Sequence, residues 1–399
     1  MRLLIADKFP EVYVAQFRAL GLEVEYQPDL TGDQLPAAAA GAQLLVVRST
    51  KVTRATIERA ARLELVIRAG AGVDTIDVDA ASARGIYVAN CPGKNSVAVA
   101  ELAMGLILAL DRRIPQQTAD LRRGAWNKKE YSKADGVKGK TLGIVGLGAI
   151  GKEVARRAAA FEMDLVTFSL PEHPSVLEDL GVRPCVSLFE LAEVSDIVTV
   201  HVPQSVETKG LFGVEFFSRM KHGAMFVNTS RGGLVDMGAL ERAMREKGLR
   251  VALDVFPGEP EGGTAEFRQS LFEMDAFIGT HHVGASTEQA QNAIAAEAVR
   301  VCREFVTTGQ APNSVNVERQ TPAKVQLIVR HYDKVGVLAA VLDVIRRHDV
   351  NVEEMTNTIF AGAKAAVAVI RLSAAPPDTV IEEIAQMKDT VIHVAAKPC

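Results

Sequence analysis

The sequence predicts an α/β protein with two Rossmann-like, doubly wound parallel sheets and a smaller ferredoxin-like domain at the C-terminus. Short apolar segments alternate with amphipathic helical segments over most of the chain, which is the pattern of parallel βαβ units. A glycine-rich turn at residues 146–151 directly follows one of these apolar segments. A polar stretch with two prolines at residues 310–322 then precedes a region with a different order of elements.

Two successive series of elements predict the two sheets. The first series is expected to form a flavodoxin-like domain with strands at residues 3–6, 44–47, 65–68 and 86–89 and helices such as 53–61 and 78–83. The second series is expected to form a dinucleotide-binding domain with six strands, at residues 141–145, 165–168, 197–200, 225–228, 251–255 and 276–278.

Two long helical segments link these series. Residues 97–110 lead into the second series, and residues 288–307 leave it and can return to the first. We therefore expect a discontinuous substrate-binding domain and a continuous dinucleotide-binding domain, followed by a third domain. Their expected bounds are 1–96 with 286–318, then 97–285, then 323–399.

The last region reads as strand, helix, strand, strand, helix and strand, which is the βαββαβ order of ferredoxin-like domains. Its elements are expected from residue 325, at 335–348, from 351, at 365–372, at 379–387 and at 391–395.

Composition limits the function classes. The chain has 399 residues, 48% of them hydrophobic and 24% charged, which is enough for two or three cores. A net charge of -4 gives no electrostatic signature of nucleic acid or anionic membrane binding. The four cysteines lie far apart without metal-like spacing, so we expect neither a metal site nor disulfides, and a cytoplasmic location. The apolar residues 97–110 are too few to span a bilayer.

The turn at residues 146–151 matches the fingerprint of a dinucleotide-binding domain. Gly146 is expected to allow the tight bend, Gly148 the approach of the pyrophosphate, and Gly151 the close packing of helix on strand. Such a motif is weak by itself, but here an apolar strand precedes it and an alanine-rich helix follows. Ser169 occupies the position that normally carries an acid for the ribose, and no arginine or lysine follows it closely. We therefore favour NAD, with NADP or dual use as alternatives.

Three residues are candidates for catalysis at a carbon that bears a hydroxyl group. Arg231, Glu259 and His282 each follow a predicted strand at the edge that carries the glycine-rich turn. An arginine can hold a carboxylate in two places, and a carboxylate beside a histidine fixes its tautomer. We expect His282 to take the hydroxyl proton, Glu259 to stabilise the charged histidine and Arg231 to hold the substrate carboxylate.

The chain resembles the D-isomer-specific 2-hydroxy acid dehydrogenases from about Asp7 to the C-terminus. The matching segments are 47–52, 68–74, 146–151, 231–233 and 254–257. The resemblance implies that the catalytic residues are Arg231, Glu259 and His282. It also implies a cofactor site made of Ala71, Gly146, Gly148, Ala149, Ile150, Gly151, Ser169, Val202, Thr229, Ser230, Asp254, Gly284 and Ala285. For the substrate it implies Arg48 and Ser49 at a phosphate, the backbone amides of Gly70, Ala71 and Gly72 at the carboxylate, and Asn95 at a neighbouring oxygen.

Two further histidines compete with His282 for the role of base. His281 stands where a proline often precedes the catalytic histidine, and the following residues 284–287 select His282. His201 is interpreted as a structural residue at the end of a strand.

The last domain resembles an ACT domain, a small amino-acid-sensing module. The resemblance implies an effector site at His331, Asp333 and Asn351, where Asp333 replaces a common amide. Together the resemblances imply NAD-dependent oxidation of 3-phosphoglycerate to 3-phosphohydroxypyruvate in L-serine biosynthesis, inhibition by L-serine, and a homodimer or homotetramer. The alternatives are a glyoxylate or hydroxypyruvate reductase and a non-enzymatic NAD-sensing protein that acts through partners.

Overall fold

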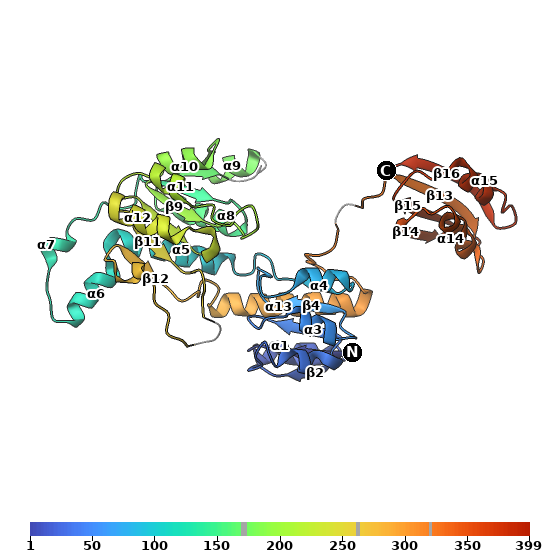
Figure 1. The fold of residues 1–399 in the computed structure, drawn as a ribbon, viewed down its shortest axis with the longest axis horizontal. Helices are drawn as coiled ribbons and strands as arrows, with labels where there is room; N and C mark the ends of the chain where they lie inside the picture. Colours follow the sequence, from blue (N-terminus) through green and yellow to red (C-terminus); the bar gives the residue numbers. More distant parts are fainter. Residues whose placement is uncertain (169–173, 261–263, 319–320) are drawn as a thin grey trace. The chain divides into compact units, whose positions relative to one another are not determined.

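The computed structural model describes residues 1–168, 174–260, 264–318 and 321–399 and divides into two compact units (Figure 1). The first unit comprises Met1–Asn316 and holds two parallel sheets, and the second comprises Val317–Cys399 and holds one antiparallel sheet. The predicted fold class is confirmed. The division into three domains at the bounds given above stays a prediction.

The first sheet has the strand order of flavodoxin-like proteins. All its strands are parallel and follow the order β2-β1-β3-β4-β5. The strands are β1 (Arg2–Ile5), β2 (Glu23–Tyr26), β3 (Leu44–Val47), β4 (Leu65–Arg68) and β5 (Tyr87–Ala89). The sequence analysis missed β2, because this edge strand alternates glutamates with apolar residues and has no fully buried position.

The second sheet has the classic order of a dinucleotide-binding domain, extended by one strand. Its seven parallel strands follow the order β12-β11-β10-β9-β6-β7-β8. They are β6 (Thr141–Val145), β7 (Asp164–Phe168), β8 (Val182–Pro184), β9 (Ile197–Val200), β10 (Met225–Asn228), β11 (Arg250–Leu253) and β12 (Phe277–Gly279). The six-strand prediction omitted β8, a three-residue edge strand with an arginine and a proline.

Helices connect the strands of these sheets, and most of the helices cover a sheet face (Figure 1). In the first unit they are α1 (Glu11–Ala19), α2 (Leu35–Ala38), α3 (Arg54–Arg59), α4 (Val78–Ala83), α5 (Ser96–Arg112), α6 (Ile114–Arg122), α7 (Lys128–Tyr131), α8 (Ala149–Ala160), α9 (Pro174–Leu180), α10 (Leu188–Val194), α11 (Val214–Arg219), α12 (Met237–Lys247) and α13 (Glu288–Thr308). The long helix α13 shares a core with β1, β3 and β4, although it follows the second sheet in sequence. The helix α5 shares a core with β6, β10 and β11 of the second sheet.

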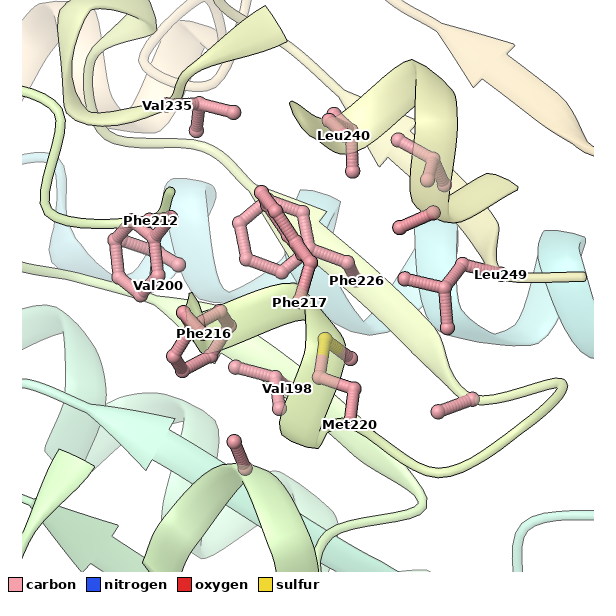
Figure 2. Packing of buried hydrophobic residues seen from close by; sticks show 14 of the residues in the cluster. Val198, Val200, Phe212, Phe216, Phe217, Met220, Phe226, Val235, Leu240 and Leu249 are labelled. Atoms are coloured by element: carbon pink, nitrogen blue, oxygen red, sulfur yellow. The ribbon is translucent and has the colours of Figure 1, made fainter. Parts of the chain in front are cut away.

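A cluster of phenylalanines fills one face of the second sheet (Figure 2). Phe226 of β10 is fully buried, and its ring packs edge-on against the rings of Phe212, Phe216 and Phe217. The centroid separations are 5.4 Å, 6.3 Å and 5.1 Å, within the range of favourable aromatic pairs. This packing fixes β10, whose end carries Arg231.

The second unit has the predicted βαββαβ order. Its elements are β13 (Val325–Tyr332), α14 (Val337–Arg347), β14 (Val352–Ile359), β15 (Ala365–Leu372), α15 (Asp378–Ala385) and β16 (Val391–Pro398). The sheet order β14-β15-β13-β16, antiparallel throughout, is ferredoxin-like. Leucine, isoleucine and valine side chains of the sheet and both helices form its core.

In the part of the chain that the structure describes, no helix combines the length and apolar character needed to cross a membrane.

Candidate active site

The glycine-rich turn joins β6 to α8 with three glycines in three different situations. Gly146 has a φ of 92°, in the left-handed region, and a Cβ atom there would lie 2.7 Å from the carbonyl oxygen of His201. A Cβ atom on Gly151 would overlap the carbonyl oxygen of Gly146. Next to a Cβ atom on Gly148 there would be no other heavy atom within 4 Å. The bend and the packing therefore require the first and third glycines, while the second leaves the backbone open towards a ligand.

Predicted cofactor residues follow β9 and β10, and one of them contacts this turn. A methyl group of Val202, which follows β9, lies next to Gly146. Thr229, which follows β10, is buried, and its hydroxyl has no hydrogen-bond partner in the described ranges. The Ser230 hydroxyl donates to the carbonyl oxygen of Val200 at 2.8 Å.

The helix α8 begins with Ala149 and Ile150, and the amides of its first turn have no partner within the helix. A bound phosphate could accept hydrogen bonds from these amides, so the turn and its surroundings fit a dinucleotide. Ser169 lies outside the described residues.

Asp254, at the end of β11, organises the loop that carries His282. Its buried carboxylate accepts hydrogen bonds from the Thr280 hydroxyl at 2.6 Å and from the amides of Val283 and Gly284, each at 2.9 Å. Its carbonyl oxygen accepts the amide of His282 at 2.7 Å. The carboxylate therefore fixes the backbone on both sides of the histidine. The placement of Asp254, Gly284 and Ala285 at a cofactor stays a prediction.

The structure brings His282 and Glu259 together. The ring Nδ1 of His282 donates to Oε2 of Glu259 at 2.6 Å, and the Phe256 amide donates to the other carboxylate oxygen at 2.7 Å. Burial works to raise the pKa of Glu259, but these hydrogen bonds and the charge of Arg231 outweigh it, so the pKa lies below its ordinary value. His282 itself has a φ of 51°, a rare conformation for a residue with a side chain, and such strain is common at functional sites.

Arg231 lies between the two sheets. Its Nε donates to Oδ2 of Asp74 at 2.8 Å, and its Nη1 donates to the carbonyl oxygen of Ser230 at 2.7 Å. A Cβ atom on Gly72 would overlap Nη2 of the same guanidinium. Asp74 and Gly72 follow β4 of the first sheet, so the loops after β4 and β10 meet at this arginine.

The predicted substrate residues lie at the ends of β3 and β4, although their backbone amides are partly occupied. The amides of Arg48 and Ser49 both donate to Asp7, and the amide of Gly70 donates to the carbonyl oxygen of Arg68 at 2.8 Å. The Gly70 amide is thus used within the chain. Asn95, at the start of α5, keeps its Oδ1 buried without a partner among the described residues.

The sequence analysis did not assign a role to Arg68, which lies among these residues. Burial lowers the pKa of its guanidinium, and the positive charges of Arg231 and Arg48 lower it further, against the opposing effect of Asp74. Its Nε is buried without a partner among the described residues. The signal was present in the sequence, because Arg68 ends a predicted strand at the ligand-facing edge of a parallel sheet.

The remaining histidine candidate, His201, is buried at the end of β9. Its Nε2 lies 2.9 Å from the Thr199 hydroxyl, and burial lowers its pKa to about 3. A neutral, enclosed ring of this kind agrees with a structural residue.

In the second unit, the structure does not gather the three effector candidates within one chain. His331 is buried, with Nδ1 2.8 Å from the Tyr332 carbonyl oxygen and Nε2 3.2 Å from Oδ1 of Asn357. It pairs with Ala366, whereas Asn351 lies beside Ser373, beyond the other end of β15. At about 3.3 Å per residue, roughly 20 Å separates the two positions.

Comparison with known proteins identifies the family. The family model described as "D-isomer specific 2-hydroxyacid dehydrogenase, NAD binding domain" matches residues 104–284. The chain belongs to the D-isomer-specific 2-hydroxyacid dehydrogenase family. The region that contains the second sheet is the NAD-binding domain of that family, and NAD is the cofactor of this chain.

Several members of this family are similar to the chain over most of its length. D-3-phosphoglycerate dehydrogenase of Methanocaldococcus jannaschii is 42% identical over 319 residues, which cover 79% of this chain and 60% of the relative. The enzyme of the same name from Mycobacterium tuberculosis is 39% identical over 350 residues, covering 85% and 63%. The chain therefore spans about three fifths of the length of these curated relatives.

Solved structures of similar sequence share the fold. The NAD⁺-bound 3-phosphoglycerate dehydrogenase of Entamoeba histolytica has a TM-score of 0.67 at 26% identity, covering 79% of this chain and 99% of that one. The TT0316 protein of Thermus thermophilus has a TM-score of 0.71 at 33% identity, covering 79% and 100%.

Proposed function

We propose that the chain catalyses the NAD-dependent oxidation of D-3-phosphoglycerate to 3-phosphohydroxypyruvate. The observation that carries this proposal is a set of three arginines at the ends of β3, β4 and β10, Arg48, Arg68 and Arg231, of which Arg231 lies near the His282–Glu259 pair. The charge of Arg231 acts on both Arg68 and Glu259, and that of Arg48 acts on Arg68. Like charges that are partly buried together are unfavourable unless an anion lies between them.

The substrate offers two anionic groups for these arginines. In the proposed arrangement Arg231 binds the carboxylate through Nη2, since Nε donates to Asp74 and Nη1 to the carbonyl oxygen of Ser230. Arg68, the last residue of β4, and Arg48, which follows β3, bind the phosphate. A substrate without a phosphate would leave the charges of these two arginines unmatched.

The hydrogen bonds of His282 define which ring nitrogen acts as the base. Because the Glu259 carboxylate can only accept, Nδ1 of His282 carries the proton and Nε2 keeps its lone pair. Nε2 then accepts the hydroxyl proton of the substrate, and Glu259 stabilises the imidazolium that forms. Bound NAD would supply the nicotinamide that accepts the hydride.

Initial rates with 3-phosphoglycerate, 3-phosphohydroxypyruvate, hydroxypyruvate and glyoxylate, each with both NAD and NADP cofactors, test the substrate assignment. We expect the phosphorylated pair to give the highest kcat/KM and NAD to be preferred. Equal rates for 3-phosphohydroxypyruvate and hydroxypyruvate would favour a glyoxylate or hydroxypyruvate reductase. No rate with any substrate would favour the NAD-sensing binding protein.

Neighbouring histidines provide a matched test of the base. His282→Ala should lower kcat by roughly 10²-fold or more. The same change at the exposed His281 should alter it by less than about threefold, because general-base catalysis needs the base within hydrogen-bond reach of the proton it takes. Similar losses in both variants would remove His282 from the role.

The proposed function includes feedback inhibition by L-serine through an ACT-type second unit. An effector site that used His331, Asp333 and Asn351 together would need two copies of this domain, since one copy holds His331 and Asn351 far apart. Activity measured against L-serine, with D-serine as the control, tests this part. An unchanged rate at saturating L-serine would contradict it.

A further inference from the structure

Asp7 is the second residue after β1 and accepts three backbone hydrogen bonds from the loop after β3. Its Oδ2 atom accepts the amide of Arg48 at 2.7 Å and the amides of Ser49 and Thr50 at 3.2 Å each. The side chain of Thr50 also donates to the carbonyl oxygens of Ala6 and Leu30, at 3.5 Å and 3.3 Å. The loop at residues 48–50 is therefore held chiefly by one carboxylate.

This contact lies at the topological switch point of the first sheet. In the order β2-β1-β3-β4-β5 the chain turns in opposite directions after β1 and β3, and these two strands are neighbours. Sheets of this kind bind anionic ligands at that point, commonly through loop amides. Three successive amides that point at one oxygen form an anion-binding concavity. Here the anion that occupies it is the carboxylate of Asp7.

The occupied amides change how a phosphate can be bound. With the amides of residues 48–50 engaged, the groups left at this edge are side chains, above all the guanidinium of Arg48. Burial lowers the pKa of Arg48, and the charge of Asp7 opposes this effect. The guanidinium has no hydrogen bond or ion pair with any residue that the structure describes, so it is available to a ligand.

We propose that Asp7 is a positioning residue that sets the specificity for a phosphorylated substrate. By filling the amide concavity, it fixes the backbone of Arg48 and presents the Arg48 guanidinium to the phosphate. It thereby turns a backbone anion site into an arginine site. This inference rests on the proposed function, because it concerns the phosphate of that substrate.

The kinetic test compares Asp7→Ala and Asp7→Asn with wild type, using 3-phosphohydroxypyruvate and hydroxypyruvate as substrates for reduction with NADH. Asp7→Ala should raise KM for the phosphorylated substrate about 10-fold or more, because hydrogen bonds to a charged group are strong. Its KM for hydroxypyruvate and kcat for both substrates should change less than about threefold. Asp7→Asn keeps one acceptor oxygen and should fall between. Asp79→Asn, on the exposed face of α4, removes the same charge and should have no effect.

Three kinetic outcomes for the Asp7 variants would overturn the proposal. A fall in KM for the phosphorylated substrate in both Asp7 variants would mean that the carboxylate only repels the phosphate. Equal losses with both substrates, or a loss confined to kcat, would mean a structural role without specificity.

Amide hydrogen exchange separates this proposal from the proposed function, because it needs no activity. Asp7→Ala should speed exchange at residues 48–50 relative to wild type and Asp79→Asn. Unchanged exchange would overturn the positioning role, whatever the kinetics. If wild type shows no preference for the phosphorylated substrate while exchange is faster in Asp7→Ala, the substrate assignment fails and so does the specificity that we infer from it.

Discussion

Two of the three glycines of the dinucleotide turn, Gly148 and Gly151, should respond in opposite ways to replacement by alanine. Gly148 has a φ of -72°, which alanine adopts freely, and no heavy atom within 4 Å of a new methyl group. Gly148→Ala should therefore fold with the stability of wild type. A methyl group at Gly151 would overlap the carbonyl oxygen of Gly146, so Gly151→Ala should lose about 1–3 kcal/mol of stability.

The effect of Gly148→Ala should appear in NAD binding. The amides at the start of α8 have no partner within the helix and are the donors for a pyrophosphate. A methyl group that keeps the phosphate from two such amides removes two charge-assisted hydrogen bonds, about 3 kcal/mol in total at about 1.5 kcal/mol each. The Kd for NAD should then rise about 150-fold.

Fluorescence titration with NADH and thermal unfolding measure the two effects separately. Gly105→Ala is the matched control, since Gly105 lies on an exposed face of α5 with the same empty surroundings and far from the turn in sequence. It should bind NADH as wild type does. Wild-type affinity in Gly148→Ala would refute the reasoning, because the pyrophosphate would then not approach the backbone at this glycine.

Three other changes test the catalytic pair, the phenylalanine cluster and the Glu297 carboxylate of α13. Glu259→Gln should lower kcat/KM about 10- to 100-fold without changing NADH affinity, because a side chain oriented by the Phe256 amide would present its NH2 group to Nδ1 of His282; Glu266→Gln is the control. Phe226→Ala should cost about 3–5 kcal/mol in urea unfolding, as expected when a fully buried ring is removed, and a smaller loss would mean that the cluster collapses to fill the space (Figure 2). Hydrogen bonds from Arg300 and Asn313 hold the pKa of Glu297 at about 2, below its ordinary 4.5. The ionised Glu297 carboxylate thus contributes about 3 kcal/mol to the free energy of unfolding above pH 4.5, and this contribution is lost as the pH falls towards 2. Glu297→Gln should therefore be less stable than wild type at pH 7 and nearly as stable as wild type at pH 2.

Sequence reasoning worked where a local pattern determines the structure. The glycine spacing at residues 146–151 predicted a strand, a tight turn and a helix, because the first and third glycines answer a steric demand of that geometry and the second leaves the backbone open. The pairing of His282 with Glu259 followed from a fold-level rule, since residues after neighbouring parallel strands meet at one edge of the sheet. The edge strands β2 and β8 were missed because short, half-exposed segments carry little hydrophobic periodicity.

Other features depend on long-range contacts that no local pattern records. Arg68, Asp74 and Asp7 each stand at or just beyond the end of a parallel strand, a position that marks them as candidates but does not reveal their partners. The predicted use of the Gly70 amide overlooked the carbonyl oxygen of Arg68, to which the folded loop directs it. Sequence therefore indicates which residues face the site, whereas the hydrogen bonds decide which of their atoms remain free for a ligand.

The distribution of charge supports the substrate that we propose. The first sheet contributes Arg48 and Arg68, the second contributes Arg231, and burial or like charge lowers the pKa of the first two. Asp74 offsets only part of the positive charge, because it is half-exposed and uses a single nitrogen of Arg231. A substrate with a carboxylate and a phosphate separated by a short carbon chain matches this arrangement at both ends. In the proposed function, binding would place its central hydroxyl between the arginines and beside His282, so the charges that select the substrate would also orient the bond that reacts.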